Sequence, residues 1–194
     1  MLDFIYSAPN ALSEKQCNRI IKFFELHPEE HEYGTTLTDD ENRNGKKSID
    51  WCKAFSTEDA VDILIQETVT EHTHQYMKNY RGINCSNNRA FQIDDFYNLQ
   101  KYEPGQGFNS WHHEYDSISA SSRVLAWMIY LNTVPDGGTM FLDQDMTVDA
   151  EAGKLLIWPA YWTHTHKSQV SYTTRKYIAT GWHVYEESND GVVR

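Results

Sequence analysis

The sequence predicts a single α+β domain that is mainly β, and three observations support this. Its 194 residues are enough to bury a core without disulfides or structural metals. Two segments with helical periodicity lie in the first half, and this periodicity is lost from about residue 90 onward. Short β-branched and aromatic runs then alternate with turn residues, which is typical of a sandwich or a barrel. We expect the helices to pack on the outside of the sheet.

The first helix is predicted from a capping box at residues 13–16, and Pro28 closes the segment. Its apolar residues recur at helical spacing: Cys17, Ile20, Ile21 and Phe24. The second helix is predicted to begin near Ser56–Thr57, with Asp59 as the acidic cap partner, and to run to about Tyr80 before Gly82.

The segment between the helices, residues 34–50, is polar and contains Asn44–Gly45, a turn dipeptide. Loops of this length in compact domains are either solvated connections or functional flaps. Both readings remain open, and in the second the loop covers a pocket and helps to choose the substrate.

Eight short runs in the second half predict strands. They are Phe91–Tyr102, Phe108–Tyr115, Val124–Val134, Thr139–Leu142, Met146–Val148, Lys154–Pro159, Thr163–Val170 and Lys176–Tyr185. Turns are expected at Pro104–Gly105, Pro135–Gly138, Gly153 and Pro159.

Charge and cysteine usage exclude several classes of protein. A net charge of −11 disfavours binding to nucleic acid, although Lys46–Lys47 beside Arg43 could form a local basic patch. The three cysteines form no CxxC pair, which argues against a disulfide framework and a thiolate zinc site. Neither a transmembrane-length apolar run nor a signal-peptide pattern is present, so we expect a cytoplasmic protein without a membrane partner.

A candidate metal motif lies in the strand-rich half, at His112-x-Glu114. Residues i and i+2 of a strand share one face, so these side chains would point into the same space. Such a pair is common by chance, but a histidine from a distant strand would complete a two-histidine, one-carboxylate set that leaves positions open on Fe(II). His164 and His166 are both candidates for that third ligand.

Six short motifs follow one another between residues 102 and 182. They are Tyr102-x-x-Gly105, Arg123 with the strand ending at Tyr130–Asn132, Gly137–Phe141, Gly153–Pro159, His166 and Lys176–Trp182. This region resembles the catalytic core of prolyl-4-hydroxylase-type 2-oxoglutarate oxygenases. Its sequence around the histidine motifs is most similar to small bacteriophage members of that family. The resemblance implies a double-stranded β-helix, or jelly roll, over residues 89–187, with residues 1–88 as helical support and flap.

The resemblance also implies the site. Iron would be held by His112, Glu114 and His166, because the family's spacing to the basic residue, Lys176, selects His166 over His164. Two departures stand out: the family's usual acidic ligand is Asp, with Asp116 here as a fallback to Glu114, and Ser168 replaces a frequent Gly.

The far carboxylate of 2-oxoglutarate would bind Lys176, with Arg175 as the competing cation. Tyr130, Tyr102 and Thr180 are further co-substrate candidates, and Asn132 and Trp182 are weaker ones.

The implied activity is hydroxylation of an unactivated C–H bond, using Fe(II) and 2-oxoglutarate and releasing succinate and CO₂. Ascorbate is a further candidate cofactor. A prolyl or other residue of a peptide or protein is the leading substrate, and a free amino acid or a nucleobase is an alternative. A cupin-like metalloenzyme that does not use 2-oxoglutarate is the other alternative. The sequence does not indicate an oligomeric state.

Overall fold

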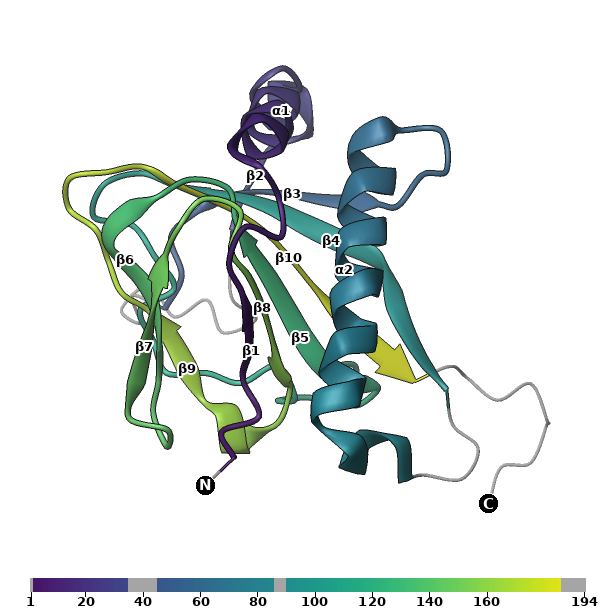
Figure 1. Cartoon of the computed structure of the whole chain (residues 1–194). Coiled ribbons are helices and arrows are strands. Elements are labelled where there is room, and N and C mark those ends of the chain that lie inside the picture. The colour runs from purple at the N-terminus through teal and green to yellow at the C-terminus, as the bar shows by residue number, and fades with distance from the viewer. Residues whose placement is uncertain (1, 35–44, 86–89, 186–194) are drawn as a thin grey trace.

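A computed structural model describes residues 2–34, 45–85 and 90–185 of the chain. Two antiparallel sheets face one another, and two long helices cover the outer face of the larger sheet (Figure 1). The predicted double-stranded β-helix with external helices is therefore confirmed.

Seven strands among the described residues form the large sheet. In spatial order they are β1 (Tyr6–Ala8), β8 (Leu155–Pro159), β5 (Arg123–Tyr130), β10 (Lys176–Tyr185), β4 (Phe91–Tyr102), β3 (Ile49–Ala54) and β2 (Glu32–Tyr33). The small sheet contains β7 (Met146–Ala150), β6 (Val134–Phe141) and β9 (His166–Ser168). An isolated bridge between His112 and His166 attaches one further segment to the free edge of β9.

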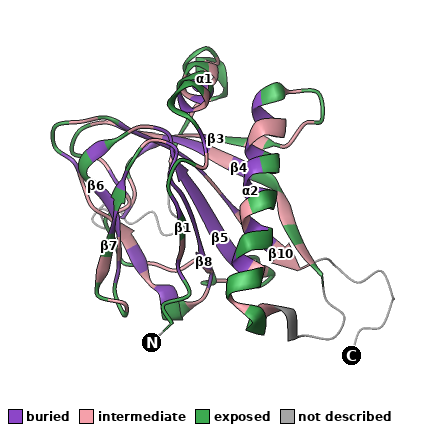
Figure 2. Ribbon diagram, in the orientation of Figure 1, coloured by how far each residue is buried: buried purple, intermediate pink, exposed green. Residues whose placement is uncertain are grey.

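Alternation along β5 separates the core into two layers. Leu125, Trp127 and Ile129 pack with the helices, whereas the intervening residues face the space between the sheets. The residues on that inner face include Ala126, Met128 and Tyr130. This central strand is buried along nearly its whole length (Figure 2). Because successive side chains of a strand point to opposite faces, one strand serves both layers.

Helix α1 (Glu14–Glu25) begins at the predicted capping box, in which Ser13 and Gln16 satisfy each other's backbone N–H groups. Helix α2 (Ala60–Asn79) begins at Asp59, whose carboxylate accepts a hydrogen bond from the Val61 N–H at 2.7 Å. The first helical residue is therefore Ala60, three residues after Thr57 of the predicted Ser56–Thr57 start. Short 3₁₀ turns occupy Pro28–Glu30, Arg81–Cys85 and Trp162–His164. None of the described helices is long and apolar enough to cross a membrane.

The predicted strand Val124–Val134 is divided between β5, which ends at Tyr130, and β6, which begins at Val134. Three further predicted elements were wrong in detail. Residues 108–115 form no regular strand and meet their neighbours only through isolated bridges. Residues 163–170 are interrupted by the Trp162–His164 turn, which leaves the short strand β9. The turn residues Pro135–Gly138 lie within β6, where the register shifts between Val134 and Thr139. Their turn chemistry produces a bulge rather than a chain reversal.

The first half also contributes strands that the sequence did not reveal. β1, β2 and β3 are short; β2 precedes the predicted 34–50 loop, and β3 includes the last two residues of that segment. Residues 35–44 of that segment, with Asn44 of the expected turn, lie outside the described residues. The turns at Gly105 and Gly153 are as predicted, and both glycines have positive φ values of 83° and 79°.

We expect Ile20→Ala to lower the free energy of unfolding by about 2–5 kcal/mol, because Ile20 is fully buried between α1 and the sheet. Ile118→Ala is the matched control, since this isoleucine is 95% exposed. Its cost should stay within about 0.5 kcal/mol. Urea denaturation measures both, and equal losses would contradict the packing of α1 described here.

Candidate active site

The site is built on two histidines, His112 and His166, that lie opposite each other on two paired antiparallel segments. The His112 N–H donates to the His166 carbonyl at 3.0 Å, and the His166 N–H donates to the His112 carbonyl at 2.8 Å. Side chains of such a hydrogen-bonded antiparallel pair lie on the same face. The two imidazole centroids are accordingly 4.4 Å apart. Phe108 stacks on the His112 ring at 3.5 Å and holds its plane.

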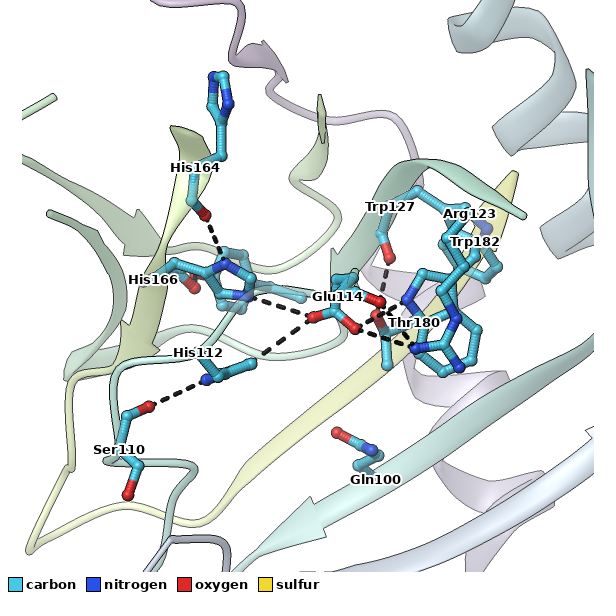
Figure 3. A network of polar contacts seen from close by, with 12 residues as sticks. Gln100, Ser110, His112, Glu114, Arg123, Trp127, His164, His166, Thr180 and Trp182 are labelled. Atoms are coloured by element: carbon cyan, nitrogen blue, oxygen red, sulfur yellow. Dashed lines mark hydrogen bonds and ion pairs between the residues drawn. The ribbon is translucent and has the colours of Figure 1, made fainter. Parts of the chain in front are cut away.

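Glu114 brings a carboxylate to the same point (Figure 3). Its Oε1 lies 3.4 Å from His166 Nε2 and 3.7 Å from His112 Nε2. The three potential ligand atoms all lie within 4.8 Å of one another. The Glu114 N–H donates to the Ala160 carbonyl at 3.0 Å, which fixes the backbone although this segment is not a regular strand.

The hydrogen bonds of the histidines leave the correct nitrogens free for a metal. His112 Nδ1 donates to the Ser110 carbonyl and His166 Nδ1 to the His164 carbonyl, each at 2.9 Å. A carbonyl only accepts, so Nδ1 carries the proton and Nε2 presents its lone pair toward Glu114. Burial and the neighbouring His166 lower the pKa of His112 to about 4, so its ring is neutral near pH 7.

The carboxylate completes a donor set suited to a divalent ion. Burial alone would raise the pKa of Glu114, but the polar groups around it, His166, His112 and the Trp182 N–H, together hold the pKa below its usual range. Two imidazole nitrogens and one carboxylate oxygen on one side of a centre form the facial arrangement found in non-haem iron oxygenases. The residues present therefore fit Fe(II).

The alternative ligands lie elsewhere. The His164 ring points away from the cluster (Figure 3), and its Nε2 is 2.8 Å from the Asp3 carbonyl, to which it donates. The Trp162–His164 turn breaks the alternation that would have put His164 and His166 on one face. Asp116 is exposed and is not part of the group of ligand atoms.

A cavity of about 350 Å³ opens beside the three ligand atoms, between the two sheets. Its inner wall is formed by every second residue of β10, as expected for one face of a strand. These residues are Lys176, Ile178, Thr180 and Trp182. Gly34, Lys46 and Asp50, from both ends of the 34–50 segment, line the same cavity.

Lys176 provides a buried cation in this cavity, with only 5% of its surface exposed. Its ammonium donates to the Gly137 carbonyl at 2.9 Å and to the Ser168 hydroxyl, and it lies 5.1 Å from the centre of the Tyr102 ring. Burial lowers its pKa to about 8. Within the described part of the chain it forms no ion pair with an acidic side chain, so one proton remains free for an anionic ligand.

The hydroxyls of the other predicted co-substrate residues already have hydrogen-bond partners within the protein. Tyr102 and Thr180 line the cavity, but their hydroxyls donate to Gln100 Oε1 at 2.7 Å and to the Trp127 carbonyl at 2.8 Å. Tyr130 does not line it. Its hydroxyl lies 2.6 Å from the Thr139 hydroxyl, and Thr139 does line the cavity.

The rival residues have structural partners. Arg175 pairs with Glu103 at 2.9 Å on the surface. Asn132 joins two strands, because its amide donates to the Arg175 carbonyl and accepts from the Tyr177 N–H, each at 2.8 Å.

Sequence reasoning missed three features of the cavity. Ser168 was noted only as a departure, yet its hydroxyl contacts Lys176. The Gly137–Phe141 motif includes Thr139, but nothing in the motif indicates that this residue lines the cavity. The third is a chain of polar contacts among residues that line the cavity from β3, β4 and the segment before β3. In it, Lys46 and the Gln100 amide both bind Asp50 Oδ2, and Gln100 also accepts from Tyr102. The pairing of Asp50 with Gln100 across β3 and β4 creates this chain, and no local pattern signals it.

Comparison with known families and structures agrees with this geometry. Residues 97–184 match a family model described as the 2OG-Fe(II) oxygenase superfamily. No curated protein matches the chain.

Solved structures share its fold at low sequence identity. A Pseudomonas putida prolyl-4-hydroxylase is 15% identical with a TM-score of 0.69, and the alignment covers 93% of this chain and 92% of that one. The viral collagen prolyl hydroxylase of Paramecium bursaria Chlorella virus-1, in a 2OG complex, is 14% identical, with coverages of 93% and 95% and a TM-score of 0.64. A Trichoplax adhaerens prolyl hydroxylase, in complex with a hypoxia inducible factor peptide fragment, is 13% identical, with coverages of 94% and 84% and a TM-score of 0.69.

We expect His166→Ala to weaken divalent metal binding by more than about 100-fold. Loss of a group that only hydrogen-bonds to a metal ligand costs roughly 10–100-fold, and loss of the ligand itself should cost more. His164→Ala, two residues away and also buried, should leave the affinity nearly unchanged, because its ring lies outside the cluster. Titration with Mn(II) measures both affinities, and circular dichroism checks that both variants fold. A reversed order of the two effects would show that His164 is the ligand.

Proposed function

We propose that this chain, a 2-oxoglutarate- and Fe(II)-dependent oxygenase whose family match covers residues 97–184, hydroxylates an unactivated C–H bond in a peptide or protein, with a prolyl residue as the leading target. The observation that carries the proposal is that a buried cation, Lys176, and the His112–Glu114–His166 cluster open into one cavity. A ligand with a metal-binding group at one end and a carboxylate at the other would satisfy both.

His112, Glu114 and His166 would hold the iron by Nε2, Oε1 and Nε2. When bound, Fe(II) and 2-oxoglutarate supply the oxidising chemistry, in which O₂ is consumed and succinate and CO₂ are released. The Lys176 ammonium would bind the distal carboxylate, and the Ser168 hydroxyl and the Gly137 carbonyl orient that ammonium.

The other residues that line the cavity would orient the co-substrate and exclude water from it. Thr139, whose hydroxyl is hydrogen-bonded to that of Tyr130, lines the cavity and pairs with Ser168 across β6 and β9, and the Lys176 ammonium lies over the Tyr102 ring. Met128, Ile178 and Trp158 make the floor apolar and exclude water, which strengthens each charged contact.

A cupin-like enzyme without 2-oxoglutarate is the less favoured function. Such a site has no use for a buried lysine that lacks an acidic partner, because an unpaired buried charge destabilises the fold. Here burial lowers the Lys176 pKa to about 8, a sign of that cost, and a bound carboxylate would offset it.

The substrate proposal has two supports. The Trichoplax adhaerens protein of the same fold was solved with a peptide fragment, and the net charge of −11 favours neutral or basic partners over nucleic acids. A free amino acid or a nucleobase remains the alternative. Use of ascorbate, a bacteriophage source, a cytoplasmic location and a single domain over residues 1–194 stay predictions.

We expect the protein to convert 2-oxoglutarate to succinate only when Fe(II) is present, and His112→Ala to abolish this turnover. Lys176→Ala should lower kcat/KM for 2-oxoglutarate by about 10- to 100-fold, because a hydrogen bond to a charged group contributes roughly 1.5–3 kcal/mol. Arg175→Ala is the matched control, since its guanidinium pairs with Glu103 at the surface. Succinate assays measure turnover, and a gain of one oxygen atom in a peptide screen reports the substrate. Unchanged turnover in both His112→Ala and Lys176→Ala would refute the assignment.

The pH dependence of co-substrate use should report the Lys176 ammonium. A lysine loses its charge as the pH rises through its pKa, so kcat/KM for 2-oxoglutarate should fall above pH of about 8. Lys176→Arg keeps the charge at all accessible pH values, so the descending limb should move to higher pH even if the overall rate is lower. If the limb stays in place in this variant, another group causes it.

A further inference from the structure

We propose that Trp182 and Arg123 form a clamp on the outer oxygen of Glu114, which keeps this glutamate oriented with a single oxygen toward the metal position. The proposal deepens the function above and rests on it, because the clamp acts on a metal ligand. It makes Trp182 and Arg123 positioning residues rather than ligands.

The contacts divide the two oxygens of Glu114 between two tasks (Figure 3). Oε1 faces the two histidines, at 3.4 and 3.7 Å from their Nε2 atoms. Oε2 is turned away and accepts a hydrogen bond from Trp182 Nε1 at 2.8 Å. This division leaves one oxygen for a metal and gives the other a fixed protein partner.

Arg123 reinforces the arrangement from the same side. Its Nη1 lies 3.7 Å from Glu114 Oε2 and donates to the Glu114 backbone carbonyl at 3.2 Å. The guanidinium also stacks on the Trp182 ring, at 3.6 Å from the ring centre. One cation thus contacts the ligand's backbone, its outer oxygen and the indole that binds the same oxygen.

The clamp belongs to a different sheet from the histidine pair. Trp182 lies on β10 and Arg123 begins β5, two paired strands of the large sheet, whereas His166 begins β9 of the small sheet. Glu114 spans the two sheets through its carboxylate. Metal geometry at this site therefore depends on contacts to both sheets.

The length of the ligand explains why a clamp is needed. Glutamate has one more rotatable bond than aspartate, so its carboxylate samples more orientations and can offer both oxygens to an ion. A second metal-bound oxygen would occupy a position that the co-substrate or O₂ requires. Holding Oε2 on Trp182 and Arg123 removes this freedom before metal arrives.

The first test measures metal affinity directly. Trp182→Phe removes the N–H and keeps most of the ring, and we expect the Mn(II) dissociation constant, from the electron paramagnetic resonance signal of free Mn(II), to rise by about 10–100-fold. Trp127→Phe is the control, because its buried indole N–H has no partner within the described residues. Thermal unfolding of both variants without metal separates lost stability from lost affinity.

The second test asks whether the clamp acts through Glu114. In a Glu114→Asp background the shorter carboxylate cannot reach the metal position and the clamp together, so Trp182→Phe should then weaken Mn(II) binding by less than about threefold. Equal effects of Trp182→Phe in both backgrounds would overturn the clamp, as would wild-type affinity in Trp182→Phe itself. A wild-type protein that binds no Mn(II) or Fe(II) would instead overturn the proposed function.

Discussion

The reciprocal backbone hydrogen bonds between His112 and His166 are the constraint on which the rest of the site depends. They attach an irregular segment to the edge strand β9 and bring two imidazoles 4.4 Å apart without any direct side-chain bond between them. Each ring is then held by a carbonyl behind its Nδ1. Glu114 follows two residues after His112, and its N–H donates to the Ala160 carbonyl, so its carboxylate lies beside both rings.

The cavity contains an anionic and a cationic side chain that do not pair with each other. Its metal end carries the Glu114 carboxylate, and Lys176 supplies a cation without an acidic partner among the described residues. Neutral acceptors, the Gly137 carbonyl and the Ser168 hydroxyl, satisfy two of the three lysine protons without cancelling its charge. The protein is strongly acidic overall, yet it keeps this one buried cation available.

The sequence predicted most of what depends on local pattern. The capping box of α1 and the strands Phe91–Tyr102 and Lys176–Tyr185 have the expected bounds, and the even-numbered residues of β10 from Lys176 to Trp182 line the cavity as alternation requires. It could not predict features that arise from pairing between distant segments. The 3₁₀ turn that directs the His164 ring away from the metal cluster, into a hydrogen bond with the distant Asp3 carbonyl, is one example. The placement of Thr139 between Tyr130 and the cavity and the Asp50–Gln100 contact are others, because they depend on strand register.

The alternation along β5 has a consequence for how such a protein changes over generations. Trp127 and its neighbours on one face belong to the helix-packed layer, and Met128 and its neighbours on the other belong to the cavity layer. A substitution on the second face can reshape the pocket while the helix-packed layer stays intact. The strand thus presents two separate packing environments from a single stretch of backbone. New substrate preferences could accumulate on one face, while the other preserves the scaffold that carries them.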